Sequence, residues 1–380
     1  MARLQKQRAC INNMKDIKSY SLIELTEYIT SLGEPAFRAK QLYQWMHEKC
    51  VSSLDEMTNI PKSLKEKLRN DDSAEAVTGE AAGGAAGETP GESITVVDIT
   101  TLNPVDIRES RDGTRKYLFE LPDGALIESV LMRYKYGNTV CVSSQVGCRM
   151  GCRFCASTMD GLTRNLTPAE MLDQIYRITS DINERISHVV VMGMGEPMDN
   201  YDTLIAFLQI LTSPEGYNLS RRNITVSTCG LVPRIREFAD ADTGVTLAIS
   251  LHAPTDELRR TMMPIAERYS IEEITDAAKY YFDRTGRRVT YEYALAKDVN
   301  DSDGCARELA ALCRRTGAHV NLIPVNPVTG RGYAPTADDG VRGFKNKLEK
   351  QGINVTIRRE LGQDIDGACG QLRKRYLGDK

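Results

Sequence analysis

Long apolar segments are absent from this 380-residue sequence. No apolar run approaches the roughly 18 residues that a membrane-spanning helix needs, and residues 1–10 lack the apolar core of a secretory signal. A transmembrane or secreted protein is therefore not expected. The sequence predicts a cytoplasmic protein, monomeric by default, with room for one large domain and a small one beside it.

Paired metal-ligand motifs are also scarce. The ten cysteines include a single Cys-x2-Cys pair, and the four histidines are widely separated: His47, His188, His252 and His319. Structural zinc sites usually join two such pairs. A disulfide framework is not expected either, because a long chain in a reducing compartment does not need covalent cross-links. The cysteines therefore indicate ligands, catalysis or core packing.

Basic residues are missing from residues 71–93, where six acidic side chains stand in a tract rich in alanine and glycine. Such a low-complexity segment has little to bury and is predicted to be an acidic linker or loop. Without it the chain carries a net charge of +3, and residues 1–70 alone carry +4. A mildly basic body is compatible with RNA binding but is equally typical of a solvated surface.

What the sequence does contain is three cysteines within eight residues, Cys148, Cys152 and Cys155, spaced C-x3-C-x2-C. One short loop of this kind can bring three thiolates to one inorganic centre. A [4Fe–4S] cube takes cysteine thiolates as its usual ligands, so three cysteines would leave one iron open to a small molecule. On spacing alone, zinc and unligated thiols remain alternatives.

The first part of the chain is predicted to hold two small units. Residues 1–70 form a helical domain, because Ser21 and Glu24 match a capping box and Ser53 and Glu56 repeat that signal. After the acidic tract, residues 94–138 change to a period of two and predict an antiparallel β extension. Its strand-like runs are 93–98, 116–121 and 127–133.

Residues 139–362 alternate between strand and helix patterns. Six β-branched runs are separated by helical segments, one of which begins at a capping box formed by Thr167 and Glu170. The runs are 139–144, 188–193, 224–229, 245–250, 289–294 and 319–324. This alternation predicts an α/β fold with a parallel sheet covered by helices, and six units rather than eight predict a partial (β/α)6 barrel. Residues 363–380 are predicted to be a C-terminal loop with a basic tail.

Several polar residues follow the ends of these strands, where ligands bind in such folds. Glu196 lies in the glycine-containing segment 193–197 and is suited to pair with an ammonium group. Further candidates follow later strands at the same rim: Ser227, Ser250, Leu251, His252 and Asn326. Taken singly, such residues are more often part of an ordinary turn, or a structural histidine, than of a ligand site.

Taken together, these motifs resemble a known family. The spacing C-x3-C-x-aromatic-C, with Phe154 as the aromatic residue, resembles the signature of the radical S-adenosylmethionine (radical SAM) enzymes. Segments 141–148 and 193–197 resemble those of the RlmN family, whose members methylate C2 of an adenosine in 23S ribosomal RNA and in tRNA. The resemblance covers residues 1–70 and 94–375. It implies that the partial barrel is a radical SAM barrel.

The resemblance also implies cofactors and partners. A [4Fe–4S] cluster is expected on Cys148, Cys152 and Cys155, with SAM as the second cofactor. Gly195 and Glu196 are expected to hold the SAM amino group. The other implied SAM contacts are Ser227, Ser250, Leu251, His252 and Asn326. The implied partners are 23S rRNA, tRNA and a reducing protein such as flavodoxin.

Two further cysteines and one glutamate acquire roles through the resemblance. Adenine C2 lies between two ring nitrogens and is too electron-poor to attack the methyl group of SAM. The resemblance implies that a first SAM methylates Cys369, and that a radical from a second SAM abstracts hydrogen from this S-methyl group. The methylene radical adds to C2, Glu128 removes the C2 proton, and Cys141 attacks the Cys369 sulfur, which leaves a disulfide. From the residues alone, a reactive pair is only one interpretation of Cys141 and Cys369.

Two other functions fit parts of the pattern. A Cfr-type methyltransferase shares these cysteines but acts at C8 of adenosine, whereas Pro197 and Pro324 favour the RlmN family. A non-catalytic, metal-stabilised RNA-binding module would contain zinc and would not need Cys369. The methylated position and the metal content distinguish the three functions.

Overall fold

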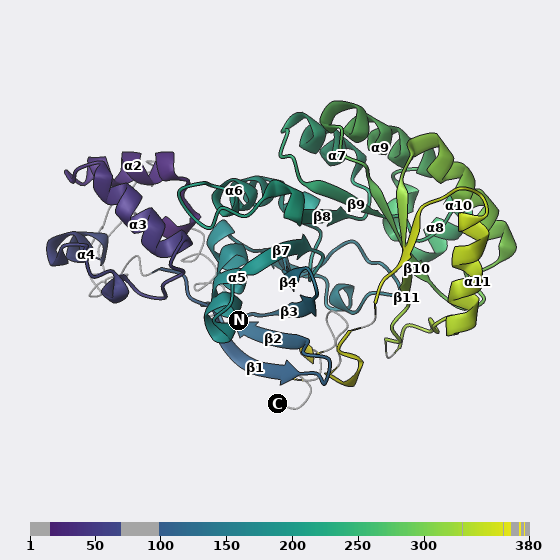
Figure 1. The fold of residues 1–380 in the computed structure, drawn as a ribbon, viewed down its shortest axis with the longest axis horizontal. Helices are drawn as coiled ribbons and strands as arrows, with labels where there is room; N and C mark the ends of the chain where they lie inside the picture. Colours follow the sequence, from purple (N-terminus) through teal and green to yellow (C-terminus); the bar gives the residue numbers. More distant parts are fainter. Residues whose placement is uncertain are drawn as a thin grey trace, which may run out of the picture.

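The computed structural model describes residues 16–69, 99–328, 330–359, 361–365, 372–373 and 376. The acidic tract and Cys369 lie outside these residues. The described part consists of an N-terminal helical unit and a large sheet covered by helices (Figure 1). Among the described residues, no helix is both long and apolar enough to cross a membrane.

The N-terminal unit contains α2 (Leu22–Ser31), α3 (Phe37–His47) and α4 (Lys62–Arg69). The capping box of Ser21 and Glu24 is confirmed, since each residue's side chain accepts a hydrogen bond from the other's backbone N–H. The box that begins at Ser53 is also present, but it caps only a 3-10 turn, Leu54–Glu56. The helix predicted there begins later because Pro61 forces the preceding residue out of helical geometry.

The six predicted runs form six parallel strands of one sheet, which confirms the α/β fold. They are β4 (Gly137–Cys141), β7 (Ile186–Val191), β8 (Ile224–Thr228), β9 (Thr246–Ser250), β10 (Thr290–Leu295) and β11 (His319–Pro324). Each pairs in parallel with the next, and β12 (Val355–Ile357) adds a further parallel strand beside β11. The parallel pairing brings the carboxyl ends of all these strands to one edge of the sheet.

The predicted antiparallel extension is joined to the same sheet. It consists of β1 (Asn103–Glu109), β2 (Arg115–Glu120) and β3 (Leu126–Tyr134), and β3 pairs antiparallel with β4. The run predicted at 93–98 lies outside the described residues. The sequence did not predict β1, because Pro104 argues against a strand; proline is tolerated here since β1 is an edge strand.

Helices alternate with the parallel strands as predicted. They are α5 (Pro168–Ile182), α6 (Tyr201–Leu211), α7 (Val232–Asp240), α8 (Asp256–Met262), α9 (Ile271–Thr285), α10 (Asp303–Thr316) and α11 (Asp338–Glu349). Neighbouring helices such as α7 and α9, or α10 and α11, lie side by side outside the sheet (Figure 1). The capping box of Thr167 and Glu170 at the start of α5 is confirmed. A separate hairpin, β5 (Gln145–Gly147) with β6 (Leu162–Asn165), brackets the cysteine loop.

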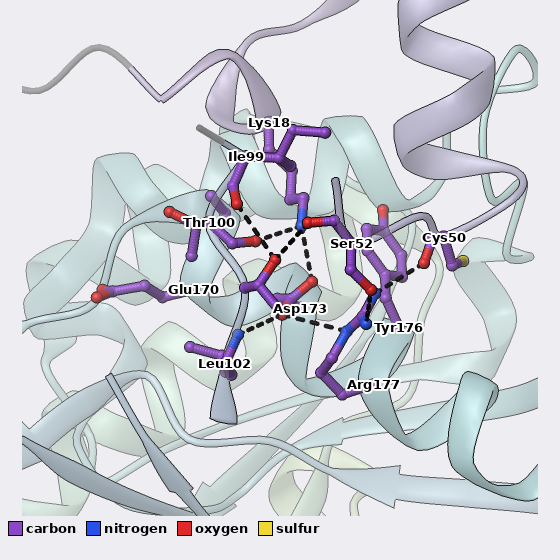
Figure 2. Close-up of polar contacts among 12 residues, drawn as sticks. Lys18, Cys50, Ser52, Ile99, Thr100, Leu102, Glu170, Asp173, Tyr176 and Arg177 are labelled. Carbon is purple, nitrogen blue, oxygen red and sulfur yellow. Dashed lines mark hydrogen bonds and ion pairs between the residues drawn. The ribbon is translucent and has the colours of Figure 1, made fainter. Parts of the chain in front are cut away.

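A buried polar junction fastens the N-terminal unit to the sheet domain (Figure 2). Lys18 Nζ lies 2.7 Å from Asp173 Oδ1 of α5, and both side chains are fully buried. Asp173 also accepts the backbone N–H of Leu102 at 2.7 Å, and Arg177 donates to the carbonyl of Cys50 at 2.8 Å. The junction therefore holds three segments that are distant in sequence against one helix.

Candidate active site

A cavity of about 260 Å³ opens at the carboxyl ends of the parallel strands. All three cysteines of the motif, Cys148, Cys152 and Cys155, line it. The other predicted site residues that line it are Gly195, Glu196, Ser227, Ser250, His252 and Asn326. The fold thus brings together residues from five separate segments of the sequence.

The cysteine loop is held in place by its backbone. Cys148 N–H donates to the carbonyl of Gly161 at 2.9 Å, and Arg153 N–H donates to that of Met262 at 2.8 Å. The hairpin leaves no room at Gly147, where a Cβ would lie 2.0 Å from the Gly161 carbonyl oxygen. Burial raises the pKa of the Cys148 thiol to about 12.

Glu196 follows β7 and is buried at the cavity wall. Its carboxylate accepts the N–H groups of Met198 at 3.0 Å and of Cys229 at 2.7 Å, and burial raises its pKa. Gly195 has a φ of +108°, and a Cβ there would lie 2.6 Å from the Cβ of Gln145. The glycine is needed because this turn packs directly on the segment that leads to the cysteine loop.

His252 is a neutral hydrogen-bond donor to the cavity. Its Nδ1 accepts the backbone N–H of Ala294 at 2.9 Å, so the ring proton resides on Nε2. Burial, and secondarily the charge of Arg259, lower its pKa to about 3. The Phe154 ring meets the imidazole edge-on at 4.8 Å between centroids, which ties the cysteine loop to this residue.

The remaining rim residues differ in position. The hydroxyl oxygens of Ser227 and Ser250 lie 3.4 Å apart across neighbouring strands, and Asn326 is exposed at the mouth. Leu251, by contrast, does not line the cavity: its side chain is fully buried in the main core. Its backbone N–H donates to the backbone carbonyl of Glu292 at 3.1 Å.

Cys141 and Glu128 lie on one face of the sheet beside the cavity. Cys141 ends β4 directly opposite Val130 of β3, and Glu128 lies two residues before Val130. Residues two apart in a strand share a face. Burial raises the pKa of Cys141. Glu128 is buried, lies 3.0 Å from Lys116 Nζ, and accepts the backbone N–H of Arg373 at 2.7 Å.

Comparisons with known proteins cover nearly the whole chain. Residues 13–73 match the ribosomal RNA large subunit methyltransferase N-terminal domain, and residues 142–306 match the radical SAM superfamily. A probable dual-specificity RNA methyltransferase RlmN from Lachnospira eligens is 56% identical over 96% of this chain and 98% of its own length. One from Lachnoclostridium phytofermentans is 49% identical over 95% of each chain. The chain belongs to the RlmN family.

A solved structure agrees with this assignment. A radical SAM methyltransferase from Sphaerobacter thermophilus is 40% identical and superposes with a TM-score of 0.83 over 94% of this chain and 98% of its own. The protein is therefore an RNA methyltransferase of the radical SAM class. Membership of that class implies a [4Fe–4S] cluster and SAM.

The donor set of this RlmN-family chain fits that cluster. Three sulfurs from one pinned loop face one cavity, and each thiolate of a cube binds its own iron. A single metal ion would instead need three or more ligands that converge on one point. In the described part of the chain, no group of three or more His, Cys, Asp and Glu residues is arranged to hold one metal ion. The cavity beyond the cysteines offers polar groups for SAM.

Two cavity residues escaped the sequence analysis. Glu292 of β10 is buried, accepts the amide N–H of Asn321 at 2.9 Å, and has its pKa raised by burial. Arg358, directly after β12, lines the same cavity. The available signal was a carboxylate inside an otherwise apolar strand run, which alternation alone does not distinguish from a solvent-facing residue.

Proposed function

We propose that this RlmN-family enzyme methylates C2 of a specific adenosine in 23S rRNA and in tRNA, using two SAM molecules per turnover. One observation carries the proposal. The cavity that collects the three cysteines also collects Glu196, His252 and Asn326, so a cluster and a nucleoside cofactor have donors within one space. The relatives' description as dual-specificity RNA methyltransferases supports RNA as the substrate.

Cys148, Cys152 and Cys155 would hold the cluster, which would supply the electron for reductive cleavage of SAM. Glu196 would accept a hydrogen bond from the ammonium group of SAM, next to the Gly195 backbone. His252 would donate a hydrogen bond from its Nε2–H group to an acceptor on SAM. Ser227, Ser250 and Asn326 complete the polar wall.

Cys369 and Cys141 act on the carbon that is transferred. Cys369 would accept a methyl group from the first SAM and lose its thiol proton. One-electron cleavage of the second SAM would give methionine and a deoxyadenosyl radical, which would remove a hydrogen atom from this S-methyl group. The methylene carbon would bond to C2, linking protein and RNA, and the adduct would return one electron to the oxidised cluster and give the C2 proton to Glu128. Attack of Cys141 on the Cys369 sulfur would then form a disulfide and break the carbon–sulfur bond, and the released carbon would take up a proton to become the methyl group. A reducing partner such as flavodoxin would supply the electrons that reduce the cluster.

The contacts of the C-terminal segment support these roles. Leu372, three positions after Cys369, is buried in a cluster with Leu118 and Leu126 of the antiparallel strands. Arg373 N–H donates to Glu128 at 2.7 Å. The strand face that carries Cys141 is therefore close to chain that follows Cys369 directly in sequence.

We also propose that the helical domain of residues 1–70 binds the RNA. Its match to the ribosomal RNA methyltransferase N-terminal domain supports this role. So does the contact between the exposed Lys49 and the half-buried Trp45, in which Nζ lies 3.6 Å from the ring centroid and offers a cation beside an aromatic ring to a phosphate or base.

The deciding experiment is an anaerobic reaction with methyl-labelled SAM and a 23S rRNA fragment or tRNA, followed by mass spectrometry of the nucleosides. We expect label in 2-methyladenosine with the wild-type enzyme and none with Cys369→Ala. Label found only in 8-methyladenosine would assign the Cfr-type reaction. A colourless protein that contains zinc and functions without Cys369 would assign the RNA-binding module.

A further inference from the structure

Among the described residues, the fully buried cationic side chains are Lys18, Lys116 and Arg259. Lys18 and Lys116 each have a carboxylate partner, at 2.7 Å and 3.0 Å. Arg259, on α8, has none: within the described part of the chain no carboxylate oxygen lies within 4.0 Å of its guanidinium. An arginine stays charged in proteins. No carboxylate therefore pairs directly with this buried positive charge, and Asp256, three residues earlier in the sequence, acts on it only from a longer distance.

The contacts of Arg259 are carbonyl dipoles. Its Nη2 donates to the carbonyl of Cys229 at 2.6 Å and its Nε to that of Leu251 at 3.2 Å. Its Nη1 is buried and has no hydrogen-bond partner. Dipoles satisfy hydrogen-bond donors but do not neutralise a charge, and a buried charge without compensation is costly. The folded chain alone does not explain why a cation is retained here.

The position of Arg259 indicates which group compensates its positive charge. Helix α8 ends at Met262, whose carbonyl accepts the Arg153 N–H within the cysteine loop. Met262 packs with Cys152 and Cys229 in one apolar cluster. Arg259 itself does not line the cavity, so it lies behind the wall that carries these sulfurs. Apolar surroundings of this kind transmit a charge with little screening.

We propose that Arg259 is the fixed positive charge that balances the anionic cluster on Cys148, Cys152 and Cys155 and makes its one-electron reduction easier. Each thiolate adds a negative charge to this site, and reduction adds another. A buried cation behind the wall stabilises the reduced state more than the oxidised one, because the reduced state is the more negative. Arg259 thus acts on the cluster without touching the substrate.

This inference rests on the cluster assignment but not on which adenosine carbon is methylated. The competing role is structural: Arg259 would only hold together the carbonyls that follow β8 and β9. The two roles differ in what they require. A structural role needs hydrogen-bond donors of the right shape, whereas charge compensation needs a positive charge and is satisfied by lysine.

The test compares Arg259→Lys, which keeps the charge, with Arg259→Gln, which removes it but keeps an N–H donor. Arg153→Gln is the matched control, because Arg153 adjoins Cys152 in sequence but is exposed and screened by solvent. Each protein is reconstituted anaerobically, its iron and sulfide are measured, and the cluster is titrated with dithionite against redox dyes while its EPR signal is recorded. Nucleoside analysis is run separately, so that failure of C2 methylation does not affect the result.

For Arg259→Gln we expect the ratio of reduced to oxidised cluster at a fixed potential to fall roughly tenfold, a shift of about 59 mV for one electron. For Arg259→Lys and Arg153→Gln we expect values close to wild type. Retention of the cluster by the lysine variant and its loss from the glutamine variant would also support the proposal. A wild-type potential in Arg259→Gln, or loss of the cluster from both Arg259 variants alike, would overturn it.

Discussion

At the scale of single residues, burial sets the protonation state of the histidines and of the Cys141 thiol. His47 and His252 both have their pKa lowered to about 3 by burial, and Cys141 has its pKa raised. The histidines are therefore neutral at any working pH, and the thiol of Cys141 is protonated until a step requires it. These states are not visible in the sequence, since they depend on which other segments cover the residue.

Removal of the Cys141 thiol should stall release of the RNA. With Cys141→Ala we expect a covalent protein–RNA adduct to accumulate, visible on a denaturing gel, while free methylated product falls about a hundredfold. Cys313→Ala is the control, because Cys313 is buried in the core on α10 away from the cavity. An adduct that fails to form in Cys141→Ala, or forms equally in the control, would remove Cys141 from its role.

The lifetime of that adduct in the wild type should depend on pH. The attacking species is the thiolate, and the pKa of Cys141 lies above its ordinary value. At pH values below that pKa, the thiolate fraction increases about tenfold for each unit by which the pH is raised. We expect quench-flow measurements between pH 7 and pH 8.5 to show faster release as the pH rises. A lifetime that lengthens over this range would contradict the assignment.

Gly195→Ala should impair SAM binding without unfolding the protein. An added Cβ would lie 2.6 Å from the Cβ of Gln145, and a φ of +108° is strained for any residue with a side chain. We expect SAM affinity, measured by equilibrium dialysis, to fall at least about tenfold. Gly124→Ala is the matched control, since its φ of +79° carries strain but no atom lies within 4 Å of the added Cβ. Equal SAM affinity in both variants would show that the tight packing at Gly195 is unimportant.

Acid stability tests the buried histidines. An unfolded histidine binds a proton below about pH 6.5, whereas folded His47 excludes it until about pH 3. Between these values the unfolded state binds more protons, so the free energy of unfolding falls as the pH falls, by about 1.4 kcal/mol per pH unit for each such group. We expect His47→Phe, which keeps the ring contact to Tyr43, to flatten this slope in urea titrations from pH 6.5 to pH 4.5. The control His188→Gln, at a partly exposed histidine, should leave the slope nearly unchanged. A larger change of slope in His188→Gln than in His47→Phe would refute the argument.

At the scale of elements, the attachment of the N-terminal unit includes one buried ion pair. Lys18 belongs to the segment before α2, and Asp173 lies in the middle of α5 (Figure 2). The pair is fully buried, unlike the exposed pair of Lys40 and Glu215. Removing Lys18 leaves the buried Asp173 with only the longer contact to Arg177, at 3.4 Å, whereas surface pairs contribute little.

Lys18→Met should therefore destabilise the protein by about 3 kcal/mol, measured by urea unfolding. The double variant Lys18→Met/Asp173→Leu should recover part of that loss, because the buried carboxylate is removed together with its lysine and only the contact of Arg177 to Asp173, at 3.4 Å, is lost in addition. Lys40→Met, the surface control, should change stability by less than about 1 kcal/mol. If the double variant lost more unfolding free energy than the two single variants lose together, the unpaired charge would not be the cause of the destabilisation.

At the scale of the whole molecule, local patterns predicted more of the barrel than of its surroundings. The six β-branched runs became β4 and β7 to β11, because parallel strands buried on both faces leave a continuous apolar signal. The pairing of β3 with β4, which joins the antiparallel strands to the barrel, has no local signal. Pairing between strands is set by tertiary contacts, and a single sequence does not reveal these contacts.

The site was predictable to a similar degree. The cysteine motif was found from its spacing. The rim residues Gly195, Glu196, Ser227, Ser250, His252 and Asn326 were found because they follow strand ends and match the family, and parallel strands bring those ends together. Arg259 was not found, because nothing in α8 distinguishes a buried arginine from the exposed Arg260 beside it. Only the folded structure shows that this charge faces inward.

The most direct test of the central claim is EPR spectroscopy of the anaerobically reduced protein before and after SAM is added. We expect about four irons and four sulfides per chain, a [4Fe–4S] signal, and a changed spectrum when SAM binds, because three cysteines leave one iron open. Absence of iron, or a signal that SAM leaves unchanged, would contradict the account.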